Sequence, residues 1–182
     1  MNLLNIVLLA ADLYGALLVL RWLLPVLSVD YTNPACRTIV RLTQPLHLPL
    51  ASVPPGPLHW PSLLIAWLWF AGLLWILYPD FPLGQLISAA VAAMLLMITN
   101  LLFITIIAWV ILSWVSPNTD QPLARLAMEV SHAACAPVRQ FLPSLGGLDL
   151  SPVFVLLLLN VLRNLVSSFA LYQPLAHLWF WL

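Results

Sequence analysis

The chain contains no lysine, and charged residues of any kind are scarce. Its 182 residues include six arginines and six acids, so only 7% are charged and the formal net charge is zero. About a quarter of the residues in a soluble domain are charged, whereas 63% of this chain is hydrophobic. This composition is typical of a protein embedded in a lipid bilayer. A nucleic-acid partner is not expected, because there is no basic excess to attract phosphate.

Cysteines and catalytic motifs are also sparse. Cys36 and Cys135 lie far apart and neither belongs to a CxxC pair, so no disulfide framework is predicted. His132 and Cys135 are spaced i,i+3 and could share a metal or haem iron, but no recognised ligand spacing is present. No nucleophile and base are arranged for catalysis. We therefore expect no metal, no cofactor and no enzymatic activity.

Four long apolar segments dominate the chain. We predict membrane-spanning helices at about 3–24, 62–78, 85–115 and 152–172, because about 20 apolar residues cross the hydrocarbon core. The first segment has no basic region before it and no small-residue cleavage site after it, so we interpret it as an uncleaved span. The third is too long for one perpendicular crossing and must tilt, bend or protrude.

The first two spans are separated by a proline-rich loop at 25–61. Within it, the apolar residues of 34–48 are spaced as in a helix, and Arg37 and Arg41 share one face. Like charges at i,i+4 repel mildly, so we expect an anion or a lipid phosphate beside them. The sequence therefore predicts a short helix at the membrane interface.

The last two spans are separated by a similar loop at 117–151. Residues 122–136 again have helical spacing, with Arg125 and Glu129 placed to pair at i,i+4. A second short interfacial helix is therefore predicted. Glu129 occupies the position that matches Arg41 in the first loop, so a pair between these two residues is the alternative.

The two halves of the chain resemble each other, since prolines and arginines recur at a spacing of 88 residues. The matched pairs are Pro34 with Pro122, Arg37 with Arg125, and Pro49 with Pro137. We predict an all-α integral membrane protein made of two parallel repeats, 1–84 and 85–182. Each repeat would contain two transmembrane helices and one interfacial loop helix.

This topology places both long loops on one side of the membrane. The loops hold Arg37, Arg41, Arg125 and Arg139, whereas the termini and the short turn between the second and third spans hold no basic residue. By the positive-inside rule the loops are cytoplasmic and both termini lie outside. These four arginines are the predicted surface for anionic lipid or a protein partner. The alternative is that they only orient the chain and pair with loop acids.

The end of the second loop, PVRQFLPSLGGLDLSP at 137–152, holds a dense set of turn residues. Gly146 and Gly147 favour a turn, Asp149 can bond to the local backbone, and the Ser151 hydroxyl can cap a helix that Pro152 begins. This pattern resembles the YggT family of small bacterial inner-membrane proteins, which includes the YlmG proteins of cyanobacteria and plastids. The motif residues are Pro137, Arg139, Pro143, Gly146, Gly147, Asp149, Ser151 and Pro152.

The resemblance covers nearly the whole chain and implies a multi-pass protein of the bacterial inner membrane. Family members usually have paired basic residues after the proline in both halves. Here the first half reads PLAS and has neither, while the second reads PVRQ and keeps one. The family is associated with osmotic-stress tolerance, potassium uptake, cell division and, in plastids, haem attachment. The resemblance therefore implies a membrane accessory protein or a component of transport.

Polar side chains are also predicted within the spans. Asp12 and Arg163 lie near the middle of the first and fourth spans, where a charge costs about 2.5–3.5 kcal/mol unless it is paired or lines a cavity. We predict that they form an intramembrane pair. The alternative, and the commoner role of such contacts, is to hold helices together. The predicted cluster comprises Asp12, Asn100, Asn160, Arg163 and Asn164.

Two functions are consistent with these features. The first is an accessory or assembly factor that uses the arginine-bearing loops to engage a membrane complex or lipid. The second is a component of ion or small-solute transport that uses the intramembrane polar cluster. The expected partners are the bilayer and either another membrane protein or further copies of this chain.

Overall fold

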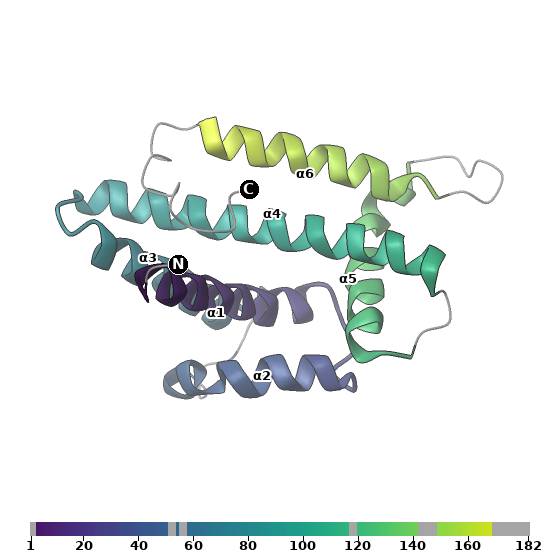
Figure 1. The fold of residues 1–182 in the computed structure, drawn as a ribbon, viewed down its shortest axis with the longest axis horizontal. Coiled ribbons are helices and arrows are strands. Elements are labelled where there is room, and N and C mark those ends of the chain that lie inside the picture. Colours follow the sequence, from purple (N-terminus) through teal and green to yellow (C-terminus); the bar gives the residue numbers. More distant parts are fainter. Residues whose placement is uncertain (1–2, 51–53, 55–57, 117–119, 142–148, 169–182) are drawn as a thin grey trace.

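The computed structural model describes residues 3–50, 54, 58–116, 120–141 and 149–168. Throughout these residues, every regular element is a helix (Figure 1). The α-helices are α1 Leu3–Val26, α2 Pro34–His47, α3 Trp60–Leu77, α4 Leu83–Val115, α5 Pro122–Arg139 and α6 Ser151–Ser168, and the short 3₁₀ helix η1 Leu48–Leu50 follows α2.

Four of the helices are long and apolar enough to cross a membrane, namely α1, α3, α4 and α6. They coincide with the four predicted spans, so the prediction of an all-helical, multi-pass membrane protein is confirmed. The boundaries differ by a few residues, since α3 begins at Trp60 and α4 at Leu83. The predicted end of the fourth span, 169–172, lies outside the described residues.

The helices α2 and α5 occupy the two loop segments that the sequence marked as helical. Proline occupies the first position of each helix, where its missing N–H costs nothing and its fixed φ suits the helix. Asn33 caps α2, because its Oδ1 accepts a hydrogen bond of 2.9 Å from the Ala35 N–H. Cys36, Ile39 and other residues of one face of α2 are buried, while Arg37 and Arg41 are exposed.

The helix α4 lies at the centre of the molecule and contacts α1, α3, α5 and α6 (Figure 1). It is an unbroken helix of 33 residues, which corresponds to roughly 50 Å. The hydrocarbon core of a bilayer is about 30 Å thick. The helix α4 therefore exceeds one perpendicular crossing, and no break at Thr99 or Asn100 shortens it.

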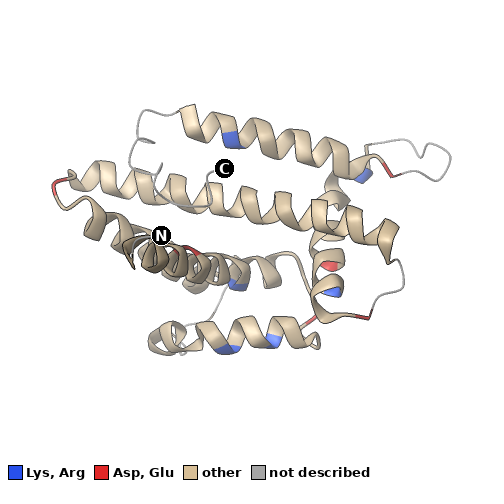
Figure 2. Cartoon of the chain, in the orientation of Figure 1, with Lys and Arg blue, Asp and Glu red and all other residues tan. Residues whose placement is uncertain are grey.

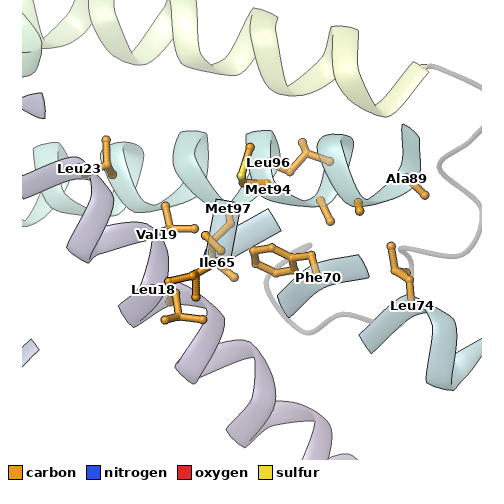
Figure 3. Close-up of a cluster of buried hydrophobic side chains, with 14 of the residues drawn as sticks. Leu18, Val19, Leu23, Ile65, Phe70, Leu74, Ala89, Met94, Leu96 and Met97 are labelled. Atoms are coloured by element: carbon orange, nitrogen blue, oxygen red, sulfur yellow. The ribbon is translucent and has the colours of Figure 1, made fainter. Parts of the chain in front are cut away.

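The largest buried cluster joins α1, α3 and α4 (Figure 3). Leu18 of α1, Phe70 of α3 and Leu96 of α4 are each almost completely buried. Gly15 permits the close approach of α1 to α3, since a Cβ at this position would lie 3.0 Å from the Phe70 ring. The Trp69 indole also donates a hydrogen bond of 3.0 Å to the carbonyl of Ala11.

Two smaller apolar clusters fix the short helices to the spans. One joins α1, α2 and α5 through Leu24, Val29, Cys36, Ile39, Leu126 and Val130. The other joins α4, α5 and α6 through Ile106, Cys135, Val155 and Leu159. Because α5 takes part in both clusters, it links α2 to the last span.

Candidate functional site

The helices α2 and α5, together with the connection Val29–Asn33 that precedes α2, form a continuous layer, here called the α2–α5 layer. Besides its apolar cluster, it is held by two polar contacts between segments far apart in sequence. The Asn33 Nδ2 donates to the carbonyl of Pro122 at 2.9 Å. The backbone N–H of Asp30 donates to Glu129 Oε2 at 3.0 Å. The segment that precedes α2 is therefore bonded to α5 at two points, Pro122 and Glu129.

Arg21, near the end of α1, reaches across to the last turns of α2. Its Nη1 donates to the carbonyl of Val40 at 2.8 Å and to Thr43 Oγ1 at 3.0 Å, and its Nη2 donates to Gln44 Oε1 at 3.1 Å. A cation beside the carbonyl end of a helix is also favoured by the helix dipole. This role of Arg21 was not predicted from the sequence, although an arginine at the end of an apolar segment was the available signal.

His47 closes the same end of α2 and was also missed. Only 6% of its surface is exposed, and its Nδ1 lies 2.9 Å from the carbonyl oxygen of Thr43. Its Nε2 is buried and makes no hydrogen bond within the described part of the chain. Burial, with a smaller contribution from Arg21, holds the pKa of His47 below its usual value. The neutral imidazole is therefore favoured here.

The four arginines predicted as a binding surface are all exposed, on α2 and α5. Figure 2 shows arginine positions on both helices, whereas α3 and α4 carry no charged residue. Among the residues that the structure describes, no carboxylate lies within 4.0 Å of Arg37, Arg41 or Arg125. The predicted pairing of Glu129 with Arg125 or with Arg41 is therefore wrong, because Glu129 binds the backbone N–H of Asp30 instead.

The fourth of these arginines, Arg139, makes an ion pair at the end of α5. Its Nη2 and Nε lie 2.6 and 3.1 Å from Asp149 Oδ2. The other carboxylate oxygen, Asp149 Oδ1, accepts the N–H of Ser151 at 2.9 Å. Asp149 thus caps α6 and holds the end of α5 at the same time, which confirms its predicted contact with the local backbone.

The predicted role of the Ser151 hydroxyl is wrong. Its Oγ is buried and has no hydrogen-bond partner in the described residues, because the Asp149 carboxylate takes the free N–H. Burial raises the pKa of Asp149, but the hydrogen bonds from Ser151 and Arg139 outweigh it, so the pKa lies below the usual value. Of the remaining motif residues, Pro137 is in α5 and Pro152 in α6, whereas Pro143, Gly146 and Gly147 lie outside the described residues.

His132 and Cys135 do not face a common site. His132 is exposed and contacts the Trp109 ring edge to face, with ring centroids 5.8 Å apart. Cys135 is 1% exposed and lies in the apolar cluster with Ile106 and Val155. Burial raises the pKa of this thiol, so the thiolate that would bind a metal is disfavoured.

Most of the predicted intramembrane polar cluster gathers between α4 and α6. A cavity of about 30 Å³ there is lined by Thr99, Asn100, Phe103, Leu159, Asn160 and Arg163. Asn164 lies one turn further along α6 and donates to Asn160 Oδ1 at 3.0 Å. Asp12 is completely buried on α1, which packs against α3 and α4. The pairing of Asp12 with Arg163 stays a prediction.

Comparisons with known proteins identify the family of the chain. The model of the CCB3/YggT family matches residues 88–170, which contain most of α4, all of α5 and all of α6. The chain is 34% identical to an uncharacterized protein of Pseudomonas aeruginosa, over 86% of this chain and 84% of that protein. It is 32% identical to the uncharacterized protein YggT of Escherichia coli, over 86% and 85% of the two chains.

A further relative, from Vibrio alginolyticus, is 33% identical over 77% of this chain and 80% of its own length. No solved structure matches the chain significantly. The similarity to the Pseudomonas and Escherichia proteins runs through both halves of the molecule, while the family model centres on the half with the Arg139–Asp149 pair. The chain therefore belongs to the CCB3/YggT family of membrane proteins.

Proposed function

We propose that the protein is an accessory or assembly factor for a membrane complex, and that it engages its partner through the outer face of the α2–α5 layer. The observation that carries the proposal is the state of Arg37 and Arg41. Both are exposed on α2, which contains no acidic residue, and no carboxylate in the described residues lies within 4.0 Å of either. Within the described residues, Arg37 donates only to the carbonyl of Tyr31, at 3.4 Å, and feels the charge of Asp30 from beyond ion-pair distance. Two guanidinium groups one helical turn apart, neither of them in an ion pair there, favour an acidic partner surface.

The apolar surroundings of these arginines support the same proposal. Leu42 and Leu46 are exposed on α2 beside Arg41. A surface that combines arginine with exposed leucine suits a partner that is acidic at its rim and apolar at its centre. The layer is held by Asn33 and by its own apolar cluster, so it would meet a partner with little reorganisation.

The proposed orientation follows from the distribution of arginine. The order of a span, a short helix and a second span occurs twice, which supports two parallel repeats at 1–84 and 85–182. The α2–α5 layer would then lie at the cytoplasmic face of a bacterial inner membrane, with both termini outside. The partner of such a layer would be a cytoplasmic region of another membrane protein.

The test is purification of the full chain from native membranes in a mild detergent, with identification of the proteins that travel with it. The Arg37→Gln/Arg41→Gln double variant should lose the partner, because both positive charges are removed while the helix is kept. Thr38→Ala, on the same exposed face, is the matched control and should retain it. Retention of the partner at the wild-type level by the double variant would refute the proposal.

The cavity between α4 and α6 favours a second candidate, transport of an ion or small solute linked to potassium and osmotic stress. Its polar lining includes Asn100, Asn160 and Arg163, and about 30 Å³ is room for a water molecule. On this proposal, potassium flux into liposomes would be lost in Asp12→Asn and Arg163→Gln and kept in the Arg37→Gln/Arg41→Gln variant. Equal flux in wild type and both polar variants would reject it.

A further inference from the structure

The cavity between α4 and α6 lies near the middle of both helices. Asn100 is close to the centre of α4 and Asn160 is close to the centre of α6, and the two helices pack side by side (Figure 1). With a rise of 1.5 Å per residue, Asn160 is about 12–14 Å from either end of its helix. The cavity is therefore remote from the lipid headgroups at both surfaces of a bilayer.

The lining of this cavity is rich in hydrogen-bond donors. Arg163 carries five N–H groups and no acceptor, and the amides of Asn100 and Asn160 carry two N–H groups each. The Asn160 oxygen already accepts from Asn164 at 3.0 Å, so this amide contributes mainly its N–H groups to the cavity. The Thr99 hydroxyl donates its hydrogen within its own helix.

A positive charge and several N–H groups at one place suit a species that only accepts hydrogen bonds. None of the six residues that line the cavity, all of them in the described part of the chain, is acidic. Arg163 has other interactions as well, but a guanidinium with five donors can bind an anion beside another partner. Hydrogen bonds to an ion are about twice as strong as those between neutral groups. A water molecule would use this lining less fully, because its own two hydrogens also need acceptors.

We propose that the cavity binds a small inorganic monovalent anion, of which chloride is the typical example. Its volume of about 30 Å³ accommodates one or two species of the size of water, which admits a halide and excludes an organic anion. The phosphate of a lipid stays with the headgroup and does not reach this depth. An ion held there would also lower the cost of keeping a guanidinium in the middle of a membrane.

Polar side chains extend from the cavity to one end of α6. Asn164 follows Asn160 by four residues and Ser167 follows Asn164 by three, so the three side chains lie along one edge of the helix. Each is at least partly exposed. This edge provides a polar route to the cavity from the end of α6 that lies away from α5 (Figure 1).

The inference concerns the charge of the species that the cavity holds, and it is independent of the α2–α5 layer and its proposed partner. It also requires no transport, because binding is measured at equilibrium without flux. Failure of the accessory function, or of the second candidate function, would therefore leave it standing, and its own failure would leave both of them to their own tests.

The test is thermal unfolding of the full chain in detergent while chloride replaces gluconate at constant sodium concentration and ionic strength. Only the identity of the anion then changes, and gluconate is too large for the cavity. The unfolding midpoint should rise with chloride and reach a plateau, since a ligand that binds the folded protein stabilises it by mass action. Bromide should act in the same way. Broadening of the chloride NMR signal by the protein, reversed by added bromide, measures the binding directly.

Two variants locate the response in the cavity. Asn160→Asp keeps the size of the side chain but replaces its N–H donors by a negative oxygen, and should weaken the apparent affinity for chloride by about 10- to 100-fold. Arg163→Gln should have an effect at least as large. Arg41→Gln removes an exposed arginine of α2 and is the matched control, which should keep the wild-type response. If a variant is less stable in gluconate, the chloride NMR signal of its folded form still reports binding.

Three results would overturn the inference. Equal midpoints in chloride and gluconate, with no broadening of the chloride signal, would assign the cavity to water. A midpoint that responds to exchange of sodium for potassium, and not to the anion, would assign it to a cation. A chloride response that is unchanged in Asn160→Asp and Arg163→Gln would place the anion elsewhere on the protein.

Discussion

The first unit, α1–α3, and the second unit, α4–α6, use an arginine differently to hold their short helix. In the first, Arg21 belongs to the span and binds neutral acceptors at the end of α2, namely the Val40 carbonyl, Thr43 and Gln44. In the second, Arg139 belongs to the short helix and binds the carboxylate of Asp149. An arginine therefore holds the short helix in both units, but the two sets of contacts contribute differently to stability.

The difference lies in what each arginine leaves behind when it is removed. Arg21 is partly buried, and its loss would leave acceptors between α1 and α2 without a donor. Arg139 and Asp149 are exposed by 44% and 43%, and ion pairs at such sites contribute little because water and salt screen them. Although an ion pair is formally the stronger contact, we expect the Arg139–Asp149 pair to contribute less to stability than the hydrogen bonds of Arg21 to neutral groups.

The first turns of the two short helices also differ in how they are capped. The helix α2 has a side-chain cap from Asn33, which also bonds to α5. No side-chain cap precedes α5 at Gln121. The fixed geometry of the α2–α5 layer therefore depends more on the first unit than on the second.

The largest effect is expected from removal of Arg21. Arg21→Ala should destabilise the protein by about 2–4 kcal/mol, since hydrogen bonds from a charged donor contribute about 1.5–3 kcal/mol and the acceptors stay partly buried. The thermal unfolding midpoint in detergent is the measurement. Arg41→Ala, an exposed arginine on the helix that Arg21 contacts, should change stability by less than about 0.5 kcal/mol. Similar losses in both variants would remove the contrast between buried and exposed arginines.

A smaller effect is expected at the junction of the two units. Asn33→Ala removes the cap of α2 and the bond to the Pro122 carbonyl, and should cost about 1–3 kcal/mol. Asn33→Asp keeps an oxygen for the Ala35 N–H but cannot donate to Pro122, so its loss should be intermediate. Thermal unfolding of the two variants separates capping from junction. If Asn33→Asp unfolded at the same temperature as the wild type, the bond to α5 would make no contribution to stability.

Near neutral pH, the dependence of stability on acid should arise from His47 in the first unit. Because burial lowers the pKa of His47, the unfolded chain takes up this proton more readily than the folded protein. Stability is therefore complete above the ordinary pKa of about 6.5 and decreases as the pH falls from there toward the folded pKa. The unfolding midpoint should decline between pH 7.5 and 5.5. His47→Gln should flatten this decline, whereas His132→Gln, at an exposed site, should not.

The smallest effect is expected at the ion pair of the second unit. Arg139→Ala should cost at most about 1 kcal/mol, and Asp149→Ala somewhat more, since it also removes the cap of α6. Because the pKa of Asp149 is lowered, its contribution is present above the ordinary pKa of an aspartate and is lost as the pH falls through the folded value. A pH titration of the unfolding midpoint checks the contribution of Asp149, and a salt titration checks the ion pair, with Arg125→Ala as control. A loss at Arg139 larger than at Arg21 would reverse the comparison.

Several features could be predicted from the sequence because they depend on local pattern. Long apolar runs located the four spans, and the helical spacing of apolar residues located α2 and α5. Asp149 was predicted to bond to the local backbone, as aspartates in turns do. Each signal lies within a few residues of the structure that it predicts. The exact helix ends were less certain, since the terminal turns depend on capping contacts.

Contacts between distant segments could not be predicted in this way. Glu129 was expected to pair with an arginine, but folding brings the N–H of Asp30 to its carboxylate from 99 residues away. Arg21 and His47 were missed because their roles depend on where the end of α2 docks against α1. A linear pattern gives charge and periodicity, whereas these roles are decided by tertiary packing.

The bond network of Arg21 also has a consequence for biogenesis. Its acceptors, Val40, Thr43 and Gln44, follow it within 23 residues, so the ribosome makes them immediately after the arginine. A nascent chain can satisfy this charge at the bilayer surface before any later span is made. The first unit can thus satisfy its arginine with its own residues, whereas α4 is made before α6, the later helix that packs against it.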